Sequence, residues 1–237
     1  MASDDRARAR LDAVTFAEIA RRRASGERGP DILSLLLDAE DEHGSRLSDQ
    51  ELRDQVMTLL FAGHDTATST VTFLFFELAR SPEHIDLLVA GGDRAARLDM
   101  AVDETLRMYP PAWIGPRRSV DAFELSGVEV PAGVNVNYCS WASHHLAEVF
   151  PEPWRFRPSR FAADAKPALP KGAYVPFGGG SRTCIGMRFG QLEVKTIAAA
   201  ILGRFRLELA EPDRRISIHQ MPTLSPRGGM PMIVRER

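Results

Sequence analysis

The residue best placed to do chemistry is Cys184, which lies in a glycine-rich segment directly before a predicted helix. Three consecutive glycines, residues 178–180, precede it and keep the backbone thin, so a flat ligand can approach closely. A cysteine at the start of a helix faces free backbone N–H groups and the positive end of the helix dipole. Both features favour thiolate over thiol. The segment therefore predicts an anionic sulfur that can act as a metal ligand.

The neighbours of Cys184 suit a flat ligand that carries carboxylates. Phe177 could cover one side of the sulfur and keep water away, and Arg182 offers a fixed cation for a carboxylate. Gly186 lets the following helix begin close to a flat ring. The alternative is a buried structural cysteine in a glycine-rich turn, which is the more common case for a lone cysteine. Zinc fits poorly because no second Cys or His lies at chelating spacing.

Four segments resemble motifs of the cytochrome P450 family and occur in the family's order. Residues 177–186 match its haem-ligand signature, Phe-x-x-Gly-x-Arg-x-Cys-x-Gly. A chance match of all the defined positions has a probability on the order of 10⁻⁵ to 10⁻⁴. Residues 104–107 match the Glu-x-x-Arg helix, and residues 158–161 resemble the Pro-Glu-Arg-Phe segment, with Ser159 in place of Glu. Residues 62–66 resemble the oxygen-groove motif.

The resemblance implies that the chain binds haem b and that the Cys184 thiolate is the axial ligand of the iron. It also implies that Arg117 binds a haem propionate, with the adjacent Arg118 as the alternative. The cofactor-binding residues implied in this way are Ala62, Arg117, Phe177, Gly178, Arg182, Cys184 and Gly186.

Two polar residues, Asp65 and Thr66, lie inside a predicted helix, where both are poor helix formers. One interpretation is that the Thr66 hydroxyl bonds back to the carbonyl of Ala62, one turn earlier. The resemblance implies instead a locally opened helix with room for dioxygen. Thr66 would then stabilise the iron-bound oxygen species and Asp65 would relay protons from solvent, so both are expected to be catalytic.

Glu104 and Arg107 are three residues apart and therefore share a helix face. By themselves they would be interpreted as a surface ion pair that contributes little. The resemblance implies instead a buried structural cluster of Glu104, Arg107 and Arg160. This cluster would fix the loop after residue 150 under the haem.

The activity implied by the resemblance is monooxygenation of a small hydrophobic organic substrate by dioxygen. Electrons would come from a ferredoxin or flavoprotein reductase that docks near Arg182 and Arg188. Two alternatives are a truncated haem-binding remnant without turnover and a haem-thiolate enzyme that uses peroxide. Because family members are about twice this length, residues 1–237 are expected to form a single partial domain that lacks the N-terminal part of the fold.

Composition disfavours several other classes of function. The formal net charge of −2 gives no general attraction to nucleic acid or to anionic membranes. The sequence contains no apolar run long enough to span a membrane and no apolar signal core after its charged start. The 2 cysteines form no disulfide framework, which is typical of a reducing compartment. We therefore expect a cytoplasmic protein.

The elements that must position these residues are mostly helices. Capping and periodicity predict helices at residues 5–24, 32–39, 49–80, 95–108 and 187–202, and another that begins at Pro82. The helix at 49–80 carries the oxygen-groove motif. Short β-type runs within residues 116–139 predict a small sheet. The fold class is therefore mainly α with small segregated β-sheets, the C-terminal portion of a cytochrome P450 fold by the resemblance.

Three details of the region after the helices are also predicted. Val134, Val136 and Tyr138 alternate with two asparagines and should share one face of a strand. Residues 150–180 lack a helical period and form a long loop of the kind that is usually functional. His144 and His145 lie on a polar stretch and are expected at the surface.

Overall fold

The computed structural model describes residues 2–89, 92–213 and 216–237. The chain divides into two compact units, Met1–His64 and Asp65–Arg237, which are described separately below. The prediction that residues 1–237 form a single partial domain stays a prediction.

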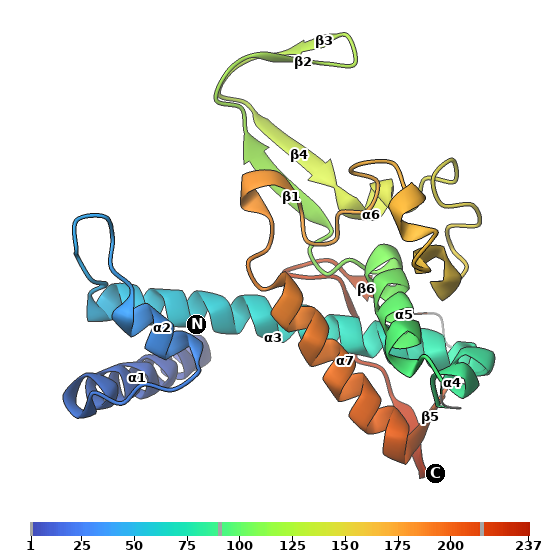
Figure 1. The fold of residues 1–237 in the computed structure, drawn as a ribbon, viewed down its shortest axis with the longest axis horizontal. Coiled ribbons are helices and arrows are strands. Elements are labelled where there is room, and N and C mark those ends of the chain that lie inside the picture. Colours follow the sequence, from blue (N-terminus) through green and yellow to red (C-terminus); the bar gives the residue numbers. More distant parts are fainter. Residues whose placement is uncertain (1, 90–91, 214–215) are drawn as a thin grey trace. The chain divides into compact units, whose positions relative to one another are not determined.

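Helices make up most of the regular structure in the described ranges (Figure 1). They are α1 (Ala2–Ser25), α2 (Ile32–Asp38), α3 (Asp49–Arg80), α4 (Pro82–Val89), α5 (Arg94–Met108), α6 (Ser140–Ser143) and α7 (Met187–Arg204), with the short 3-10 helices η1 (Pro158–Phe161), η2 (Lys166–Ala168) and η3 (Gly180–Arg182). The strands are β1 (Ile114–Arg118), β2 (Phe123–Leu125), β3 (Val128–Val130), β4 (Asn135–Cys139), β5 (Phe205–Leu209), β6 (Ile218–His219), β7 (Ser225–Pro226) and β8 (Met232–Glu236).

The strands form small, separate antiparallel pairs: β1 with β4, β2 with β3, β5 with β8, and β6 with β7. The predicted fold class, mainly α with small segregated sheets, is confirmed. The helix predicted at 49–80 has those bounds in the structure.

The first unit consists of α1, α2 and the beginning of α3. Its core contains Ile19, Leu37 and Leu52, one from each helix. Side-chain caps stabilise the starts of α2 and α3. Asp31 accepts a hydrogen bond from the Ser34 N–H at the start of α2. Before α3, the Ser48 N–H donates to Glu51 and the Glu51 N–H donates to the Ser48 hydroxyl, as a capping box requires.

The second unit has one large apolar core, to which α3, α4, α5 and α7 all contribute. Leu74, Leu98 and Ala198 represent three of these helices in the core. Residues 101–108 of α5 are buried without exception, so this helix has no solvent face over its last two turns. Charged side chains in that stretch therefore need partners inside the protein.

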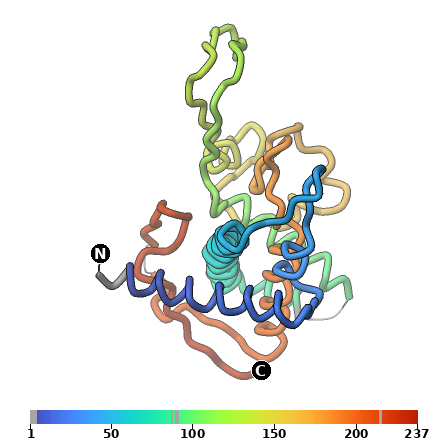
Figure 2. The backbone as a smooth tube through the Cα atoms, turned by 90° about the vertical axis from the view of Figure 1, so that its left-hand side faces the viewer, coloured from blue at the N-terminus to red at the C-terminus, as the bar shows by residue number. Residues whose placement is uncertain are grey.

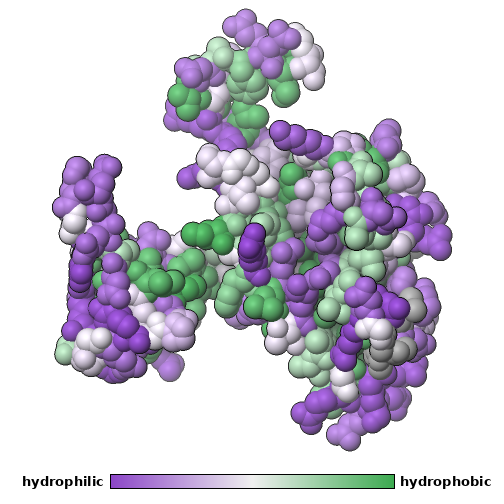
Figure 3. All heavy atoms as spheres, viewed as in Figure 1, coloured by the Kyte–Doolittle hydropathy of each residue, from purple (hydrophilic) through white to green (hydrophobic). Residues whose placement is uncertain are grey.

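β1 and β4 form a two-stranded ribbon that continues into the β2–β3 hairpin. In Figures 1 and 2 this hairpin projects away from the helices of its unit. Its exposed apolar side chains, which include Phe123, Leu125 and Val128, give the patches of apolar surface on the hairpin in Figure 3. Along β4 the predicted alternation is confirmed for Val136 and Tyr138, which are half-buried between the exposed Asn135 and Asn137. Val134, predicted on the same face, lies before the strand and is 36% exposed.

The prediction for His144 was wrong. Its side chain is completely buried, because the single-turn helix α6 folds it against α5. His145, by contrast, is half-buried and stacks with Trp154.

Candidate functional site

The loop of residues 177–186 is held by its own backbone hydrogen bonds. The Cys184 N–H donates to the Phe177 carbonyl at 2.9 Å, and the Thr183 N–H donates to the Gly180 carbonyl at 3.1 Å. These bonds fix the backbone on both sides of the glycines. α7 begins three residues after Cys184, at Met187. The cysteine therefore lies in a closed loop at the start of a helix.

The Cys184 side chain is exposed. A Cβ added at Gly186, the N-cap of α7, would lie 3.9 Å from the Cys184 Sγ. The sulfur is thus next to the first turn of α7, where backbone N–H groups have no partner within the helix. Apolar side chains surround this end of the helix. Ile185 is 95% exposed and Phe189 is 66% exposed.

Gly178 is the point at which the cysteine loop meets the β1–β4 ribbon. Its φ is +71°, a conformation that side chains with a Cβ rarely adopt. A Cβ at this position would also lie 3.0 Å from the Tyr138 hydroxyl, closer than nearly all real Cβ contacts. Glycine is therefore required here both by the backbone conformation and by the approach of Tyr138.

The two adjacent arginines of β1 differ in their surroundings. The Arg117 guanidinium lies over the Tyr138 ring, with Cζ 5.3 Å from the ring centroid, and Nη2 is 4.0 Å from the Cβ position of Gly178. Both arginines also donate to backbone carbonyls, Arg117 Nη1 to Pro116 at 2.8 Å and Arg118 Nε to Gly133 at 3.0 Å. Of the two candidates left open by the sequence, only Arg117 lies beside the cysteine loop.

Arg182 and Phe177 occupy different environments within the same loop. Arg182 belongs to the turn η3 and is exposed. Phe177 is half-buried and packs against the main core of the second unit. Its packing anchors the loop, and its predicted role as a cover for the sulfur stays a prediction.

The predicted cluster around Glu104 is brought together in the structure. Arg107 donates to both carboxylate oxygens of Glu104, with Nε–Oε2 at 2.7 Å and Nη2–Oε1 at 2.9 Å. The Arg160 Nε donates to Oε1 at 3.2 Å, and the Arg157 N–H donates to the same oxygen at 2.9 Å. Glu104 and Arg107 are both 0% exposed and Arg160 is 8% exposed. This is a buried, bidentate ion pair and not a surface pair.

The remaining donors of the cluster hold the loop after residue 150. Arg107 donates to the His144 carbonyl at 2.9 Å and to the Pro153 carbonyl at 2.8 Å. Arg160 donates to the Glu152 carbonyl at 2.9 Å. The cluster therefore fixes the path of residues 144–160 against α5.

His144 extends this network to the residues just before the cysteine loop, a role that sequence reasoning missed. Its Nε2 accepts the Val175 N–H at 2.9 Å, and its Nδ1 lies 3.2 Å from the Arg107 carbonyl oxygen. An accepting Nε2 requires that Nδ1 carries the proton. Burial lowers the pKa of His144 to about 4, so the ring is neutral at pH 7. The adjacent histidine pair gave no local signal of this burial.

Tyr174 and Asp103 form a second connection between the same elements. The Tyr174 hydroxyl donates to the Asp103 carboxylate at 3.0 Å, and Lys166 Nζ donates to the other carboxylate oxygen at 2.5 Å. Burial, together with the Asp103 charge, raises the pKa of Tyr174. The two residues before Pro176 are therefore held in place, Tyr174 by Asp103 of α5 and Val175 by His144, which gives the cysteine loop a fixed base.

The motif at residues 62–66 lies within α3. Ala62 belongs to the first unit, whereas Asp65 and Thr66 belong to the second. The helix runs through these positions without interruption, so the structure does not bear out the predicted local opening. The Thr66 carbonyl accepts a hydrogen bond from the Thr70 hydroxyl at 2.8 Å. The role predicted for Ala62 in cofactor binding stays a prediction.

The donor set beside Cys184 fits haem. It combines one accessible sulfur, exposed apolar surface from Ile185 and Phe189, and the guanidinium of Arg117 next to the loop. Haem needs a soft axial ligand, an apolar surface for its ring and cations for its propionates. A multi-residue metal site does not fit. In the described ranges, no three His, Cys, Asp or Glu side chains are grouped so that they could hold a metal ion.

Comparison with known families decides between a haem site and another kind of metal site. The family model for cytochrome P450 matches residues 5–230. The chain belongs to the cytochrome P450 family. In general, members of this family hold haem through a cysteine thiolate, which agrees with the chemistry of the Cys184 loop.

Two curated relatives show the extent of the similarity. A putative cytochrome P450 136 of Mycobacterium tuberculosis is 36% identical in an alignment 248 positions long, gaps included, which covers 98% of this chain and 50% of that protein. Cyclooctat-9-en-7-ol 5-monooxygenase of Streptomyces melanosporofaciens is 40% identical in an alignment 218 positions long, gaps included, which covers 86% of this chain and 48% of that protein. The chain thus spans about half the length of the curated relatives that it matches.

Solved structures show the same fold. The haem domain of cytochrome P450DA has a TM-score of 0.86 and 30% identity, over 97% of this chain and 54% of that one. The retinoic acid-bound cyanobacterial cytochrome CYP120A1 has a TM-score of 0.87 and 29% identity, over 98% of this chain and 57% of that one.

None of the helices within the described residues combines the length and the apolar character needed to cross a bilayer.

Proposed function

We propose that this chain forms the haem-thiolate part of a cytochrome P450 monooxygenase, with the Cys184 sulfur as the axial ligand of haem b. The observation that carries the proposal is the exposed Cys184 side chain at the start of α7, in a loop closed by the Phe177 carbonyl. When bound, haem supplies the activation of dioxygen for insertion of one oxygen atom into a substrate, and a thiolate ligand favours O–O cleavage.

Arg117 and Arg182 bind the carboxylates of the cofactor. The position of Arg117 against Gly178 supports its choice over Arg118. Guanidinium groups suit this task because they stay charged and offer several fixed donors. Gly178 and Gly186 keep the backbone close to the ring, and Phe177 excludes water from the sulfur side.

Asp65 and Thr66 handle protons at the dioxygen site. The Thr66 hydroxyl donates a hydrogen bond there, and the Asp65 carboxyl transfers protons to it from solvent. This assignment is supported by the motif at residues 62–66 and by the location of both residues in the central part of a long helix. Carboxyl groups are among the side chains that commonly transfer protons in active sites.

The substrate is a small hydrophobic organic molecule, and the electrons come from a ferredoxin or flavoprotein reductase. Two similar proteins, a cyclooctat-9-en-7-ol monooxygenase and a retinoic acid-bound cytochrome, are named for hydrophobic molecules, which supports a hydrophobic substrate. Arg182 and Arg188 are both exposed beside the cysteine loop, which supports an acidic partner on that side. Residence in the cytoplasm follows as part of the same proposal.

The activity is tested with haem-loaded protein, a ferredoxin with its reductase and NADPH, and an alkoxycoumarin as a general substrate probe. We expect dealkylation that requires dioxygen and that is lost in Cys184→Ser. Haem binding without turnover under these conditions would favour the haem-binding remnant. Turnover only when hydrogen peroxide replaces the electron donors would favour the peroxide-using enzyme.

A further inference from the structure

Tyr138 of β4 packs against Gly115, Gly178 and Arg117, of which the last two belong to the proposed cofactor site. In the β1–β4 register it lies directly opposite Gly115. A Cβ at Gly115 would overlap the Tyr138 ring, so the ring occupies the space above this glycine. The ring and its hydroxyl therefore pack directly on Gly115 of β1.

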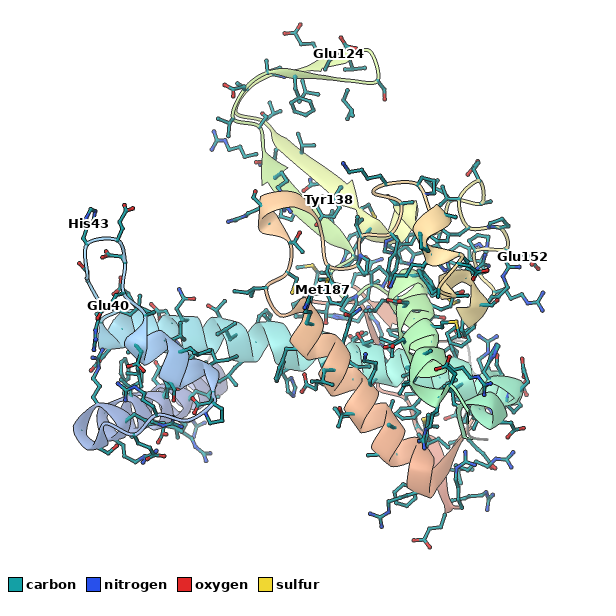
Figure 4. The ribbon with its side chains drawn as sticks, in the orientation of Figure 1. Glu40, His43, Glu124, Tyr138, Glu152 and Met187 are labelled. Atoms are coloured by element: carbon teal, nitrogen blue, oxygen red, sulfur yellow. The ribbon has the colours of Figure 1, made fainter. Side chains whose placement is uncertain are left out.

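The hydroxyl of Tyr138 reaches the cysteine loop. It lies 3.0 Å from the Cβ position of Gly178, the residue that follows Phe177. The Phe177 carbonyl is in turn the acceptor for the Cys184 N–H. The Tyr138 hydroxyl thus contacts the loop one residue away from the group that fixes the cysteine backbone. Figure 4 labels Tyr138 on β4, beside the loop that leads to Met187.

The ring of Tyr138 also supports Arg117. The guanidinium lies over the ring face, with Cζ 5.3 Å from its centroid, a distance typical of a cation–π contact. Arg117 lies two residues after Gly115 in β1, so it is on the face of β1 that the Tyr138 ring covers. One aromatic side chain therefore sets the spacing between the Arg117 cation and the cysteine loop.

We infer that Tyr138 is a positioning residue for the cofactor: it sets the distance between Arg117 and the Cys184 loop without itself serving as a ligand. The inference rests on the proposed function, because it assigns Cys184 to the iron and Arg117 to a propionate. The two groups hold one rigid molecule at two places, so a change in their spacing weakens both attachments. Groups that orient metal ligands in this way typically change metal affinity by about 10- to 100-fold.

The first test replaces the ring. In Tyr138→Leu we expect the rate of haem transfer to apomyoglobin to rise by about 10- to 100-fold. We also expect part of the reduced carbon monoxide complex to lose its thiolate-type Soret band. Val136→Ala is the matched control, because Val136 is half-buried on the same face of β4 and lies opposite Arg117. It should lower the urea midpoint of the haem-free chain without changing the band.

The second test probes the contact between the Tyr138 hydroxyl and Gly178 and leaves the aromatic ring in place. Gly178→Ala should weaken haem retention, because the new Cβ meets the Tyr138 hydroxyl and the backbone φ is positive. Tyr138→Phe removes only the hydroxyl. The double variant Gly178→Ala with Tyr138→Phe should therefore retain haem better than Gly178→Ala alone. The part of the loss that comes from backbone strain should persist.

The outcomes separate this inference from the proposed function. If wild-type protein gives no thiolate-type band, the assignment of Cys184 fails and the inference fails with it. If wild type gives the band but Tyr138→Leu keeps both the band and the wild-type rate of haem transfer, only the inference is overturned. An equal loss of haem in Gly178→Ala with and without the Tyr138→Phe change would also overturn it.

Discussion

Replacing Glu104 by Gln should be among the most damaging single changes available in this chain. The carboxylate accepts two hydrogen bonds from Arg107, one from the Arg160 side chain and one from the Arg157 N–H. Gln has nearly the same shape, but it carries no charge and one of its two oxygens becomes an NH₂ donor. The variant leaves Arg107, which is 0% exposed, without a counter-charge and places a donor against its guanidinium.

The magnitude follows from the burial of the pair. Breaking a buried ion pair by removing one partner costs about 3–5 kcal/mol. Single domains are stable by only about 5–15 kcal/mol, so the variant should lose a large part of its stability. The measurement is urea denaturation of the chain, followed by far-UV circular dichroism and by tryptophan fluorescence.

Glu152→Gln is the matched control for this prediction. Glu152 also pairs with an arginine three residues later, Arg155, but both side chains are mostly exposed and the N–O distance is 3.4 Å. An exposed pair of this kind contributes about 0–1 kcal/mol, so the control should unfold close to wild type. If Glu104→Gln were as stable as Glu152→Gln, the claim that the buried cluster holds the loop after residue 150 would be refuted.

Three further predictions follow from the site. Arg117→Gln should release haem faster than wild type by about 10-fold or more, whereas Arg118→Gln should not, because only Arg117 lies beside the cysteine loop; equal rates of transfer to apomyoglobin would contradict this. The free energy of unfolding should fall by about 3 kcal/mol as the pH drops from 6.5 towards 4, because His144 gains a proton near pH 6.5 in the unfolded chain but only near pH 4 in the folded one. The difference in urea stability between wild type and His144→Gln should therefore change with pH. Plots of stability against pH that run parallel for the two proteins would contradict this prediction. Thr66→Val should bind haem normally but lose about 100-fold or more in substrate oxidation, because it lacks the hydroxyl proposed to handle protons; an unchanged rate would remove Thr66 from the mechanism.

Much of the fold could be predicted from sequence because its signals are local. The capping box at Ser48 and Glu51 fixes the start of α3, and the alternation along β4 fixes which residues face inward. The cysteine loop could be predicted for a similar reason, since a contiguous set of glycines, an arginine and a cysteine determines its chemistry. The Glu104–Arg107 pair could also be predicted from its local spacing, although its burial depends on distant segments.

The features that the sequence did not reveal depend on contacts between distant segments. His144 lies on a polar stretch, and its burial arises from Arg107 and Val175, which are 37 and 31 residues away. The contact between Tyr138 and Gly178 likewise joins a strand to a distant loop. The choice between Arg117 and Arg118 required the strand register, which shows that Arg117 shares a face with Gly115.

The most direct test of the account is a reduced-plus-carbon-monoxide spectrum of the haem-loaded chain, with its 2 cysteines changed one at a time. Wild type and Cys139→Ser should both give a thiolate-type Soret band, and Cys184→Ser should lose it while its circular dichroism stays that of the folded chain. A thiolate-type band that persists in Cys184→Ser, or that disappears in Cys139→Ser, would show that the sulfur at the start of α7 is not the bond to iron.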